Sequence, residues 1–179
     1  MSIQYDVIII GAGAAGMMSA IEAGKRGRKV LLVDHYKKIG EKIRISGGGR
    51  CNFTNINTNP SKFLSQNPKF VRSALSQYTQ NDFINLINKY EIKFHEKKLG
   101  QLFCDHSAQQ IVVMLLKECE LANVTILKEF IIKDVDKEND QYLVSTESDN
   151  YSSQSLIIAT GGLSVPKIGA TSFGYEIAK

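Results

Sequence analysis

Three glycines and one carboxylate near the start of the chain have the types and the spacing that bind a dinucleotide. An apolar run at residues 7–10 leads into Gly11, Gly13 and Gly16. Gly11 allows a tight turn, Gly13 lets a pyrophosphate approach the backbone, and Gly16 lets the following helix pack closely. A second apolar run, residues 30–33, ends in Asp34. This acid follows Gly16 by roughly the 20 residues expected for a carboxylate that binds a ribose diol.

The expected chemistry is binding rather than bond breaking. Phosphates would lie on free N–H groups at the N-terminus of the helix that follows the glycines, where the helix dipole is positive. A glycine turn in an ordinary α/β domain gives a similar local pattern. The ordered series of strand, glycines, alanine-rich helix, second strand and acid favours a dinucleotide site.

A Rossmann-like α/β fold with a parallel sheet would position these residues. We predict strands at residues 7–10, 30–33 and 155–159 and a helix at residues 14–26. Ligands of such sheets bind at the carboxyl ends of parallel strands. Gly11, Asp34 and Thr160 each follow a predicted strand, so we expect all three at that edge.

The region between the second and third of these strands predicts a helical insertion and a β-meander. An irregular segment at residues 35–60 precedes predicted helices at 69–78, 81–90 and 107–122. Strands of the meander are expected at 124–127, 130–135 and 142–146. The irregular segment contains the run from Gly47 to Gly49. Close backbone approach to a ligand explains that run better than core packing, because glycine runs cost backbone entropy.

Composition narrows the class of protein. With 179 residues, 43% hydrophobic and 22% charged, the chain has the size and balance of one globular domain. No apolar run reaches the ~18 residues that span a bilayer, so we expect no membrane partner. The N-terminus lacks the basic start of a signal peptide, which predicts a cytoplasmic protein. Three cysteines without a CxxC pair predict neither a metal site nor a disulfide framework.

The net charge of +4 is unevenly distributed. Nine basic and two acidic residues lie between Lys25 and Arg50. Nucleic acid is one explanation for such a patch. Because these charges flank the predicted phosphate site, we expect a small-molecule substrate and no nucleic-acid partner.

Several longer motifs resemble a known family. Residues 11–16 read GAGAAG, residues 45–55 read ISGGGRCNFTN, residues 159–162 read ATGG, residues 164–169 read SVPKIG and residues 173–174 read FG. Together they resemble the BaiN/YhiN-like NAD(P)/FAD-dependent oxidoreductases, which are two-dinucleotide-binding-domain flavoproteins. The resemblance covers essentially the whole chain. It implies that residues 1–179 are the N-terminal part of an FAD-binding domain, incomplete relative to the family, whose members continue with an inserted β domain and a C-terminal return.

The resemblance also implies roles for individual residues. It places the pyrophosphate on Gly11, Gly13, Ala14, Ala15 and Gly16, the adenosine ribose on Asp34, and the adenine near His35 and the backbone of Ile131. It further assigns Lys42 and Arg44 to phosphate oxygens, Gly48, Asn52 and Thr54 to the ribitol or flavin, and Thr160 and Gly161 to a cofactor contact at a strand end. For His35, Lys42 and Arg44 a solvated role stays open, and for Ile131 a core role. Cys51 is either a redox thiol or, as we favour, part of a packed loop.

The resulting functional hypothesis is an FAD-dependent oxidoreductase that transfers a hydride through the flavin, with NAD(P)H as the reductant. The protein would orient the flavin and exclude water. Catalytic residues remain unknown, because no acid–base pair stands out. Two alternatives stay open: an NAD-dependent dehydrogenase domain, and an inactive nucleotide-binding or interaction module. An uncovered sheet edge would favour self-association or pairing with a complementing C-terminal segment.

Overall fold

The computed structural model describes residues 2–165 and 169–178. The chain folds into two compact units. We call Met1–Lys42 with Val112–Lys179 the sheet unit, and Ile43–Ile111 the insert unit. Residues 166–168 of the SVPKIG motif lie outside the described residues.

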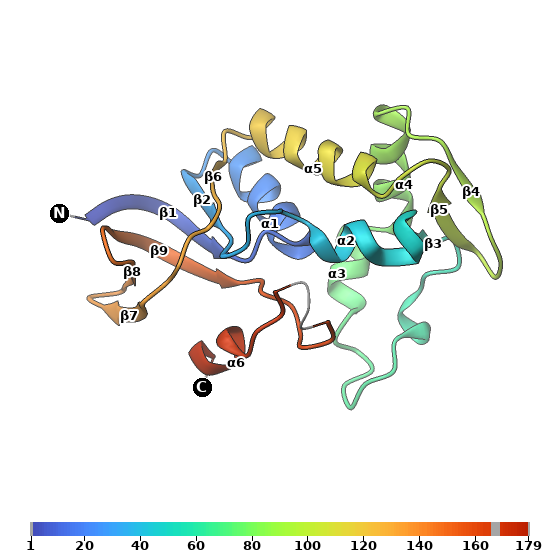
Figure 1. The fold of residues 1–179 in the computed structure, drawn as a ribbon. Helices are drawn as coiled ribbons and strands as arrows, with labels where there is room; N and C mark the ends of the chain where they lie inside the picture. The colour runs from blue at the N-terminus through green and yellow to red at the C-terminus, as the bar shows by residue number, and fades with distance from the viewer. Residues whose placement is uncertain (1, 166–168, 179) are drawn as a thin grey trace. The chain divides into compact units, whose positions relative to one another are not determined.

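The sheet unit is built on a six-stranded sheet with the order β6-β2-β1-β9-β8-β7 (Figure 1). Its parallel strands are β1 (Ser2–Ile10), β2 (Val30–Val33), β6 (Thr125–Leu127) and β9 (Asn150–Ile158). Strands β7 (Asp134–Glu138) and β8 (Gln141–Ser145) continue the sheet from β9 as an antiparallel hairpin. The α/β Rossmann-like fold with a parallel sheet is therefore confirmed.

The prediction of a three-stranded meander at residues 124–146 is wrong in two respects. The strand at 124–127 is β6, which pairs in parallel with β2 and not with the hairpin. The strand predicted at 130–135 begins only at Asp134. The apolar pattern there has another cause, because Phe130 is buried in the core cluster and Ile132 packs against it from a connecting segment. Apolar side chains buried from a loop give the same sequence signal as a strand.

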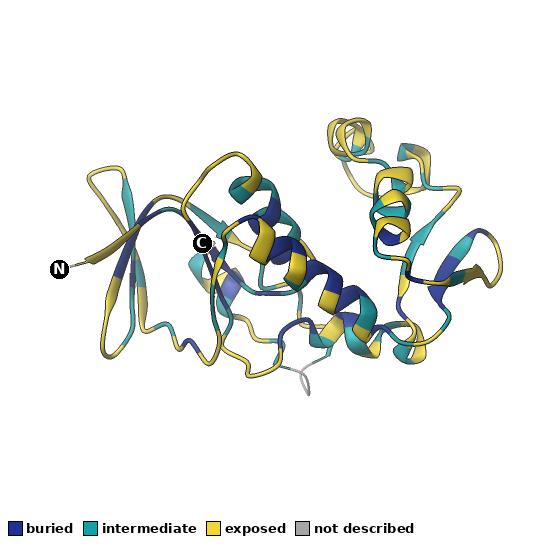
Figure 2. Ribbon diagram, turned by 90° about the horizontal axis from the view of Figure 1, so that it is seen from above, coloured by how far each residue is buried: buried dark blue, intermediate teal, exposed yellow. Residues whose placement is uncertain are grey.

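The core lies on both faces of the parallel sheet. Alternate residues of β1 point to opposite faces, so Ile8 and Ile10 share a cluster with Phe130 and Tyr151 while Ile9 faces the other way. Helices α1 (Ala14–Lys25) and α5 (Gln109–Leu121) are close to their predicted ranges. The long helix α5 is dark blue along one side in Figure 2, which marks its buried face.

Helices α1 and α5 are joined by polar contacts as well as by packing. The carboxylate of Glu118 is buried and lies 3.2 Å from the Lys25 ammonium group. The Cys119 thiol donates to the Met17 carbonyl oxygen at 3.8 Å. These contacts hold α1, and with it the glycine loop at its start, against the rest of the unit.

The insert unit combines short helices with a three-stranded antiparallel sheet of order β3-β5-β4. Its elements in chain order are α2 (Glu41–Ile45, which begins in the sheet unit), the 3₁₀ helix η1 (Ser46–Gly49), β3 (Asn52–Asn55), the 3₁₀ helix η2 (Pro60–Lys62), α3 (Arg72–Gln77), α4 (Gln80–Lys89), β4 (Phe94–Glu96) and β5 (Gln101–Cys104). Helix α4 starts at a capping box in which the side chains of Thr79 and Asp82 each bond the other's backbone N–H. The last described helix is α6 (Phe173–Ile177), which belongs to the sheet unit.

Candidate functional site

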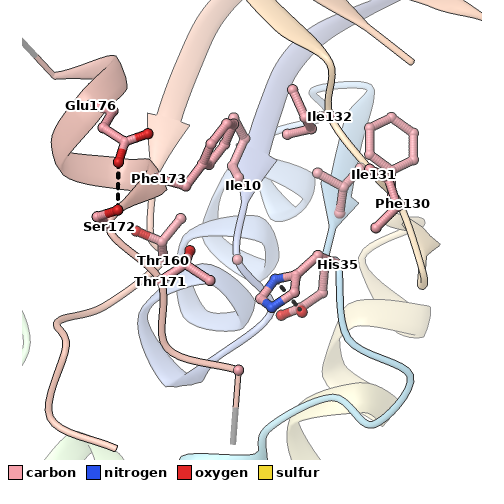
Figure 3. A pocket seen from close by; sticks show the side chains of 14 residues that line it. Ile10, His35, Phe130, Ile131, Ile132, Thr160, Thr171, Ser172, Phe173 and Glu176 are labelled. Atoms are coloured by element: carbon pink, nitrogen blue, oxygen red, sulfur yellow. Dashed lines mark hydrogen bonds and ion pairs between the residues drawn. The ribbon is translucent and has the colours of Figure 1, made fainter. Parts of the chain in front are cut away.

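A pocket of about 300 Å³ lies at the carboxyl ends of β1, β2 and β9 (Figure 3). Five residues predicted from the sequence line it: Gly11, Asp34, His35, Ile131 and Thr160. In Figure 3, His35 and Ile131 lie on one side of the pocket and Thr160 and Phe173 on the other. The structure thus brings together residues from three strand ends that are far apart in the sequence.

The three glycines of the loop differ in what surrounds them. Gly11 has a φ of +103°, and a Cβ there would lie 2.6 Å from the Ala159 carbonyl oxygen. A Cβ on Gly16 would overlap the carbonyl oxygen of Gly11. A Cβ on Gly13 would meet no atom within 4 Å. Gly11 and Gly16 are therefore needed by the fold, whereas Gly13 faces open space that a ligand can enter.

The N-terminus of α1 borders this open space. Gly13 is its N-cap, and no side chain caps the helix. The first N–H groups of a helix, here those around Ala14 and Ala15, have no partner within the helix. Together with the helix dipole they make a site suited to phosphate oxygens.

Asp34 ties the glycine loop to the end of β2. Its Oδ2 accepts the N–H of Ala12 at 2.8 Å, and its Oδ1 accepts the N–H of Tyr36 at 2.8 Å. An ionised carboxylate has about four acceptor sites, so two remain for the hydroxyls of a ribose. The Nδ1 atom of His35 lies 3.6 Å from Oδ1, and the His35 ring is half exposed.

The wall of the pocket is mostly apolar and includes residues that the sequence analysis missed. The missed lining residues are Phe130, Ile132, Gly169, Thr171, Ser172, Phe173 and Glu176. Two of them had a signal in the sequence: Gly169 ends the SVPKIG motif and Phe173 begins the FG motif. Ile131, by contrast, was implied as an adenine contact, and it is 64% exposed. Such exposure does not fit a core role for this side chain.

Lys42 has protein partners in the sheet unit. Its ammonium group donates to the Ser164 hydroxyl at 2.9 Å and to the Gly162 carbonyl oxygen at 3.4 Å. Gly161, with a φ of +74°, lies beside it. Lys42 thus holds the segment after β9, and its contact with a phosphate stays a prediction.

Four further predicted residues lie in the insert unit. Arg44 is on α2, and Gly48 is in η1 with a φ of +67° and open space where a Cβ would stand. Asn52 and Thr54 are on β3. With its amide turned to satisfy its neighbours, Asn52 donates to the carbonyl oxygens of Leu102 at 3.2 Å and Thr54 at 3.1 Å. Their roles toward a flavin remain predictions.

The cysteines of the insert unit are poor nucleophiles. Cys51 is buried with a φ of +51°, and burial raises the pKa of its thiol although a hydrogen bond with Ser46 lowers it. Burial, then the neighbouring Cys51 and Asp105, raise the pKa of Cys104 to about 11. Thiols that stay protonated at neutral pH react slowly. This supports the packed-loop interpretation of Cys51.

Neither a metal-binding cluster nor a membrane-crossing helix is found among the described residues. No group of three histidine, cysteine or acidic side chains among them is placed to hold a metal ion. None of the helices in residues 2–165 and 169–178 has the length and apolarity needed to cross a membrane.

Comparison with known proteins gives a family and three curated relatives. The family described as HI0933-like protein Rossmann domain matches residues 5–179. Over 176 residues the chain is 54% identical to the ribosomal RNA dihydrouridine synthase of Escherichia coli K12, covering 98% of this chain and 44% of the relative. The protein of the same name from Haemophilus influenzae is 49% identical over 183 residues, covering 100% of this chain and 46% of the relative. The 3-dehydro-bile acid delta(4,6)-reductase of Clostridium scindens is 26% identical over 175 residues, covering 96% and 42%.

The fold likeness to solved structures agrees with the topology. The 3-ketosteroid-delta4-(5alpha)-dehydrogenase of Rhodococcus jostii superposes with a TM-score of 0.63 at 12% identity, covering 89% of this chain and 46% of that one. At this identity the likeness concerns the fold alone. The chain spans about half the length of the curated relatives that it matches.

Proposed function

The chain belongs to the HI0933-like protein Rossmann domain family, and we propose that it is the FAD-binding part of a flavoprotein that reduces uridine in ribosomal RNA. The observation that carries the proposal is the identity of 54% with a ribosomal RNA dihydrouridine synthase over 98% of this chain. An identity of this size extends beyond the glycine motif, which many nucleotide-binding proteins share.

The pocket of the sheet unit fits the adenosine diphosphate half of FAD. The uncapped N-terminus of α1 and the open space at Gly13 suit the pyrophosphate. The free acceptor sites of Asp34 suit the ribose hydroxyls. The exposed side chain of Ile131 offers an apolar surface to the adenine ring.

The proposed reaction saturates a carbon–carbon double bond. Dihydrouridine is uridine with two hydrogens added across C5=C6, a bond conjugated to the C4 carbonyl. When bound, FAD supplies a hydride carrier, and we propose NAD(P)H as the source of the hydride. One hydride and one proton from solvent account for the two hydrogens added, while NAD(P)H is oxidised to NAD(P)⁺.

The bile acid relative supports the reaction class. Its name describes reduction of double bonds in a steroid that carries a 3-oxo group. A conjugated enone and a uracil ring each contain an electron-poor carbon that accepts a hydride. The task of this chain is to hold the cofactor, and no residue of it is assigned to proton transfer.

The expectation of no nucleic-acid partner stays a prediction. The names of the two most similar curated relatives reported above favour an RNA partner instead. The basic residues between Lys25 and Arg50 are compatible with either a phosphate site or RNA. In this proposal the substrate is therefore a uridine of ribosomal RNA and not a small molecule.

Cofactor binding is tested first on the chain itself. FAD binding to the purified protein is measured from the quenching of flavin fluorescence, and binding of NAD⁺ and NADP⁺ is measured by calorimetry. The proposal predicts saturable binding of FAD and weaker or no binding of the nicotinamide nucleotides. A chain that binds NAD⁺ but not FAD would instead be the dehydrogenase domain.

The reaction is tested in an E. coli K12 strain that lacks its own ribosomal RNA dihydrouridine synthase. The strain receives a chimera in which this chain replaces the aligned 44% of the E. coli protein. Mass spectrometry of digested ribosomal RNA should find dihydrouridine restored. If the chimera is folded and carries FAD but the RNA lacks dihydrouridine, the proposed substrate is wrong.

A further inference from the structure

One stretch of the chain, most of it in the insert unit, combines basic residues with exposed apolar side chains. No acidic residue occurs between Glu41 and Asp82, a stretch with six basic residues. Residues 61–70 within it are all exposed. Large apolar side chains stand out there, with Leu64 at 96% and Phe70 at 77% exposure. Exposed aromatic and basic side chains without acids are the combination found in proteins that bind single-stranded nucleic acid.

A groove of about 790 Å³ is lined mainly by residues 55–63 of this stretch. We call it the asparagine groove; its lining residues are Asn55, Ile56, Asn57, Thr58, Asn59, Lys62, Phe63 and Leu99. Lys62 supplies a cation, Phe63 an exposed ring and Asn57 an amide. All lie in the insert unit.

The groove is shaped by hydrogen bonds that leave one amide available. The Asn55 side chain donates to the Leu99 carbonyl oxygen at 3.0 Å and accepts the N–H of Asn57 at 2.8 Å. The Asn59 side chain accepts the N–H of Ser61 at 3.0 Å. The side-chain amide of Asn57, in contrast, has no hydrogen-bond partner among the described residues, and the side chain is exposed.

The hairpin turn between β4 and β5 packs closely on the groove. Gly100 has a φ of +80°, and a Cβ there would lie 2.5 Å from Nδ2 of Asn57 and 2.6 Å from Oδ1 of Asn55. The turn between β4 and β5 therefore packs directly on the asparagines. The N-cap of η2, Asn59, fixes the start of the short helix that carries Lys62 and precedes Phe63.

We propose that the asparagine groove binds an unpaired segment of the ribosomal RNA substrate. Lys62 contacts a phosphate, Phe63 stacks on a base, and the Asn57 amide bonds a base edge. Unpaired bases offer both a face for stacking and an edge for hydrogen bonds, which a duplex does not. The inference rests on the proposed RNA substrate and adds where this chain holds it.

Binding is measured by fluorescence anisotropy with a labelled, unstructured RNA of about 12 nucleotides, within the usual site size of single-strand binders. Phe63→Ala should raise Kd by about fivefold or more, because stacking on a base is lost. Lys62→Ala should lower the slope of log K against log salt by about 0.7, the value for one phosphate contact on a single strand. Duplex RNA of the same length should bind more weakly.

Two pairs of variants serve as controls. One pair distinguishes stacking on a base from simple apolar contact, and the other distinguishes a specific phosphate contact from general positive charge. Phe63→Trp should keep the affinity, while Phe63→Leu should lose as much as Phe63→Ala. Lys93→Ala, an exposed lysine of the same unit outside the groove, should leave the salt slope unchanged. If Phe63→Leu binds like the parent chain, or if Lys62→Ala and Lys93→Ala behave alike, the groove is not the RNA site.

The complementation strain distinguishes failure of this inference from failure of the proposed function. A chimera with Lys62→Ala and Phe63→Ala should keep its FAD and restore less dihydrouridine than the parent chimera. Full restoration by this variant would overturn the groove assignment and leave the proposed function intact. A parent chimera that restores nothing would overturn the proposed function, and the binding assay would still decide the groove.

Discussion

The carboxylate of Asp34 accepts the backbone N–H of Ala12 at 2.8 Å, so the end of β2 fixes the conformation of the glycine loop after β1. The same carboxylate retains further acceptor sites, which bind the ribose hydroxyls in the proposed complex. Asp34 thus links the shape of the phosphate site to recognition of the sugar.

Replacement of this acid should weaken FAD binding strongly. In Asp34→Asn the amide has only one acceptor oxygen for the N–H groups of Ala12 and Tyr36, and its NH₂ faces a donor. Hydrogen bonds to a charged group contribute about 1.5–3 kcal/mol, so the Kd for FAD should rise about 10- to 100-fold. Fluorescence titration measures the change. Asp136→Asn, on exposed strand β7, is the control, and equal effects of the two variants would contradict the assignment.

Gly13 and Gly16 allow a test that separates binding from folding. Gly13→Ala adds a methyl group to open space, so Tm should change by less than about 3 °C while the affinity for FAD falls. Gly16→Ala forces a methyl group onto the Gly11 carbonyl oxygen and should cost about 1–3 kcal/mol of folding free energy. Thermal melts and FAD titrations on both variants give the comparison. If Gly13→Ala bound FAD as tightly as the parent chain, the pyrophosphate would not lie on this loop.

Because of the buried thiols, the free energy of unfolding should fall as the pH becomes alkaline. Burial, followed by nearby charge, raises the pKa of Cys104 and of Cys119 to about 11 in the fold, from an ordinary value of 9.0. A raised thiol pKa stabilises the fold fully below pH 9, and this stabilisation is lost as the pH rises toward 11. Each thiol should account for about 1–3 kcal/mol of that loss.

The loss is measured as the free energy of urea unfolding between pH 8 and pH 11. A variant with Cys104→Ala and Cys119→Ala will be less stable at pH 8, since both side chains are buried, but its stability should fall less steeply with pH. Equal slopes for the variant and the parent chain would show that the fold does not raise the pKa values of these thiols.

The strand ends of the cofactor pocket could be predicted because their determinants are local. Gly11 and Asp34 each follow an apolar run, and the topology rule for parallel sheets then places them at one edge. The structure brings them into the same pocket. Spacing along the chain was enough for these residues, since the helix between the two strands has a nearly fixed length.

The other side of the pocket depends on long-range packing that periodicity does not encode. Phe130 reaches the core from a loop, where its N–H donates to the Asp34 carbonyl oxygen at 3.0 Å. Glu176 enters the pocket only because α6 returns to the end of β9. The strands of the insert unit were missed for a different reason: all three are only three or four residues long, and β3 and β4 are also largely polar.

The position of α6 rests on Gly174, which packs on Thr160 at the end of β9. A Cβ at position 174 would overlap Oγ1 of Thr160 and lie 3.1 Å from a methyl carbon of Ile158. Gly174→Ala should therefore displace α6, lower the unfolding free energy by about 1–3 kcal/mol and weaken FAD binding, because Phe173 and Glu176 move with the helix.

A double-mutant cycle tests the cause of that loss. Thr160→Ala removes the hydroxyl that the new methyl group would overlap, so the double variant should recover a large part of the stability lost by Gly174→Ala. The coupling energy should reach about 0.5–3 kcal/mol, the range for residues in contact. Additive effects of the two substitutions would mean that α6 does not rest on Thr160, and the pocket would then lack the wall that Phe173 and Glu176 provide.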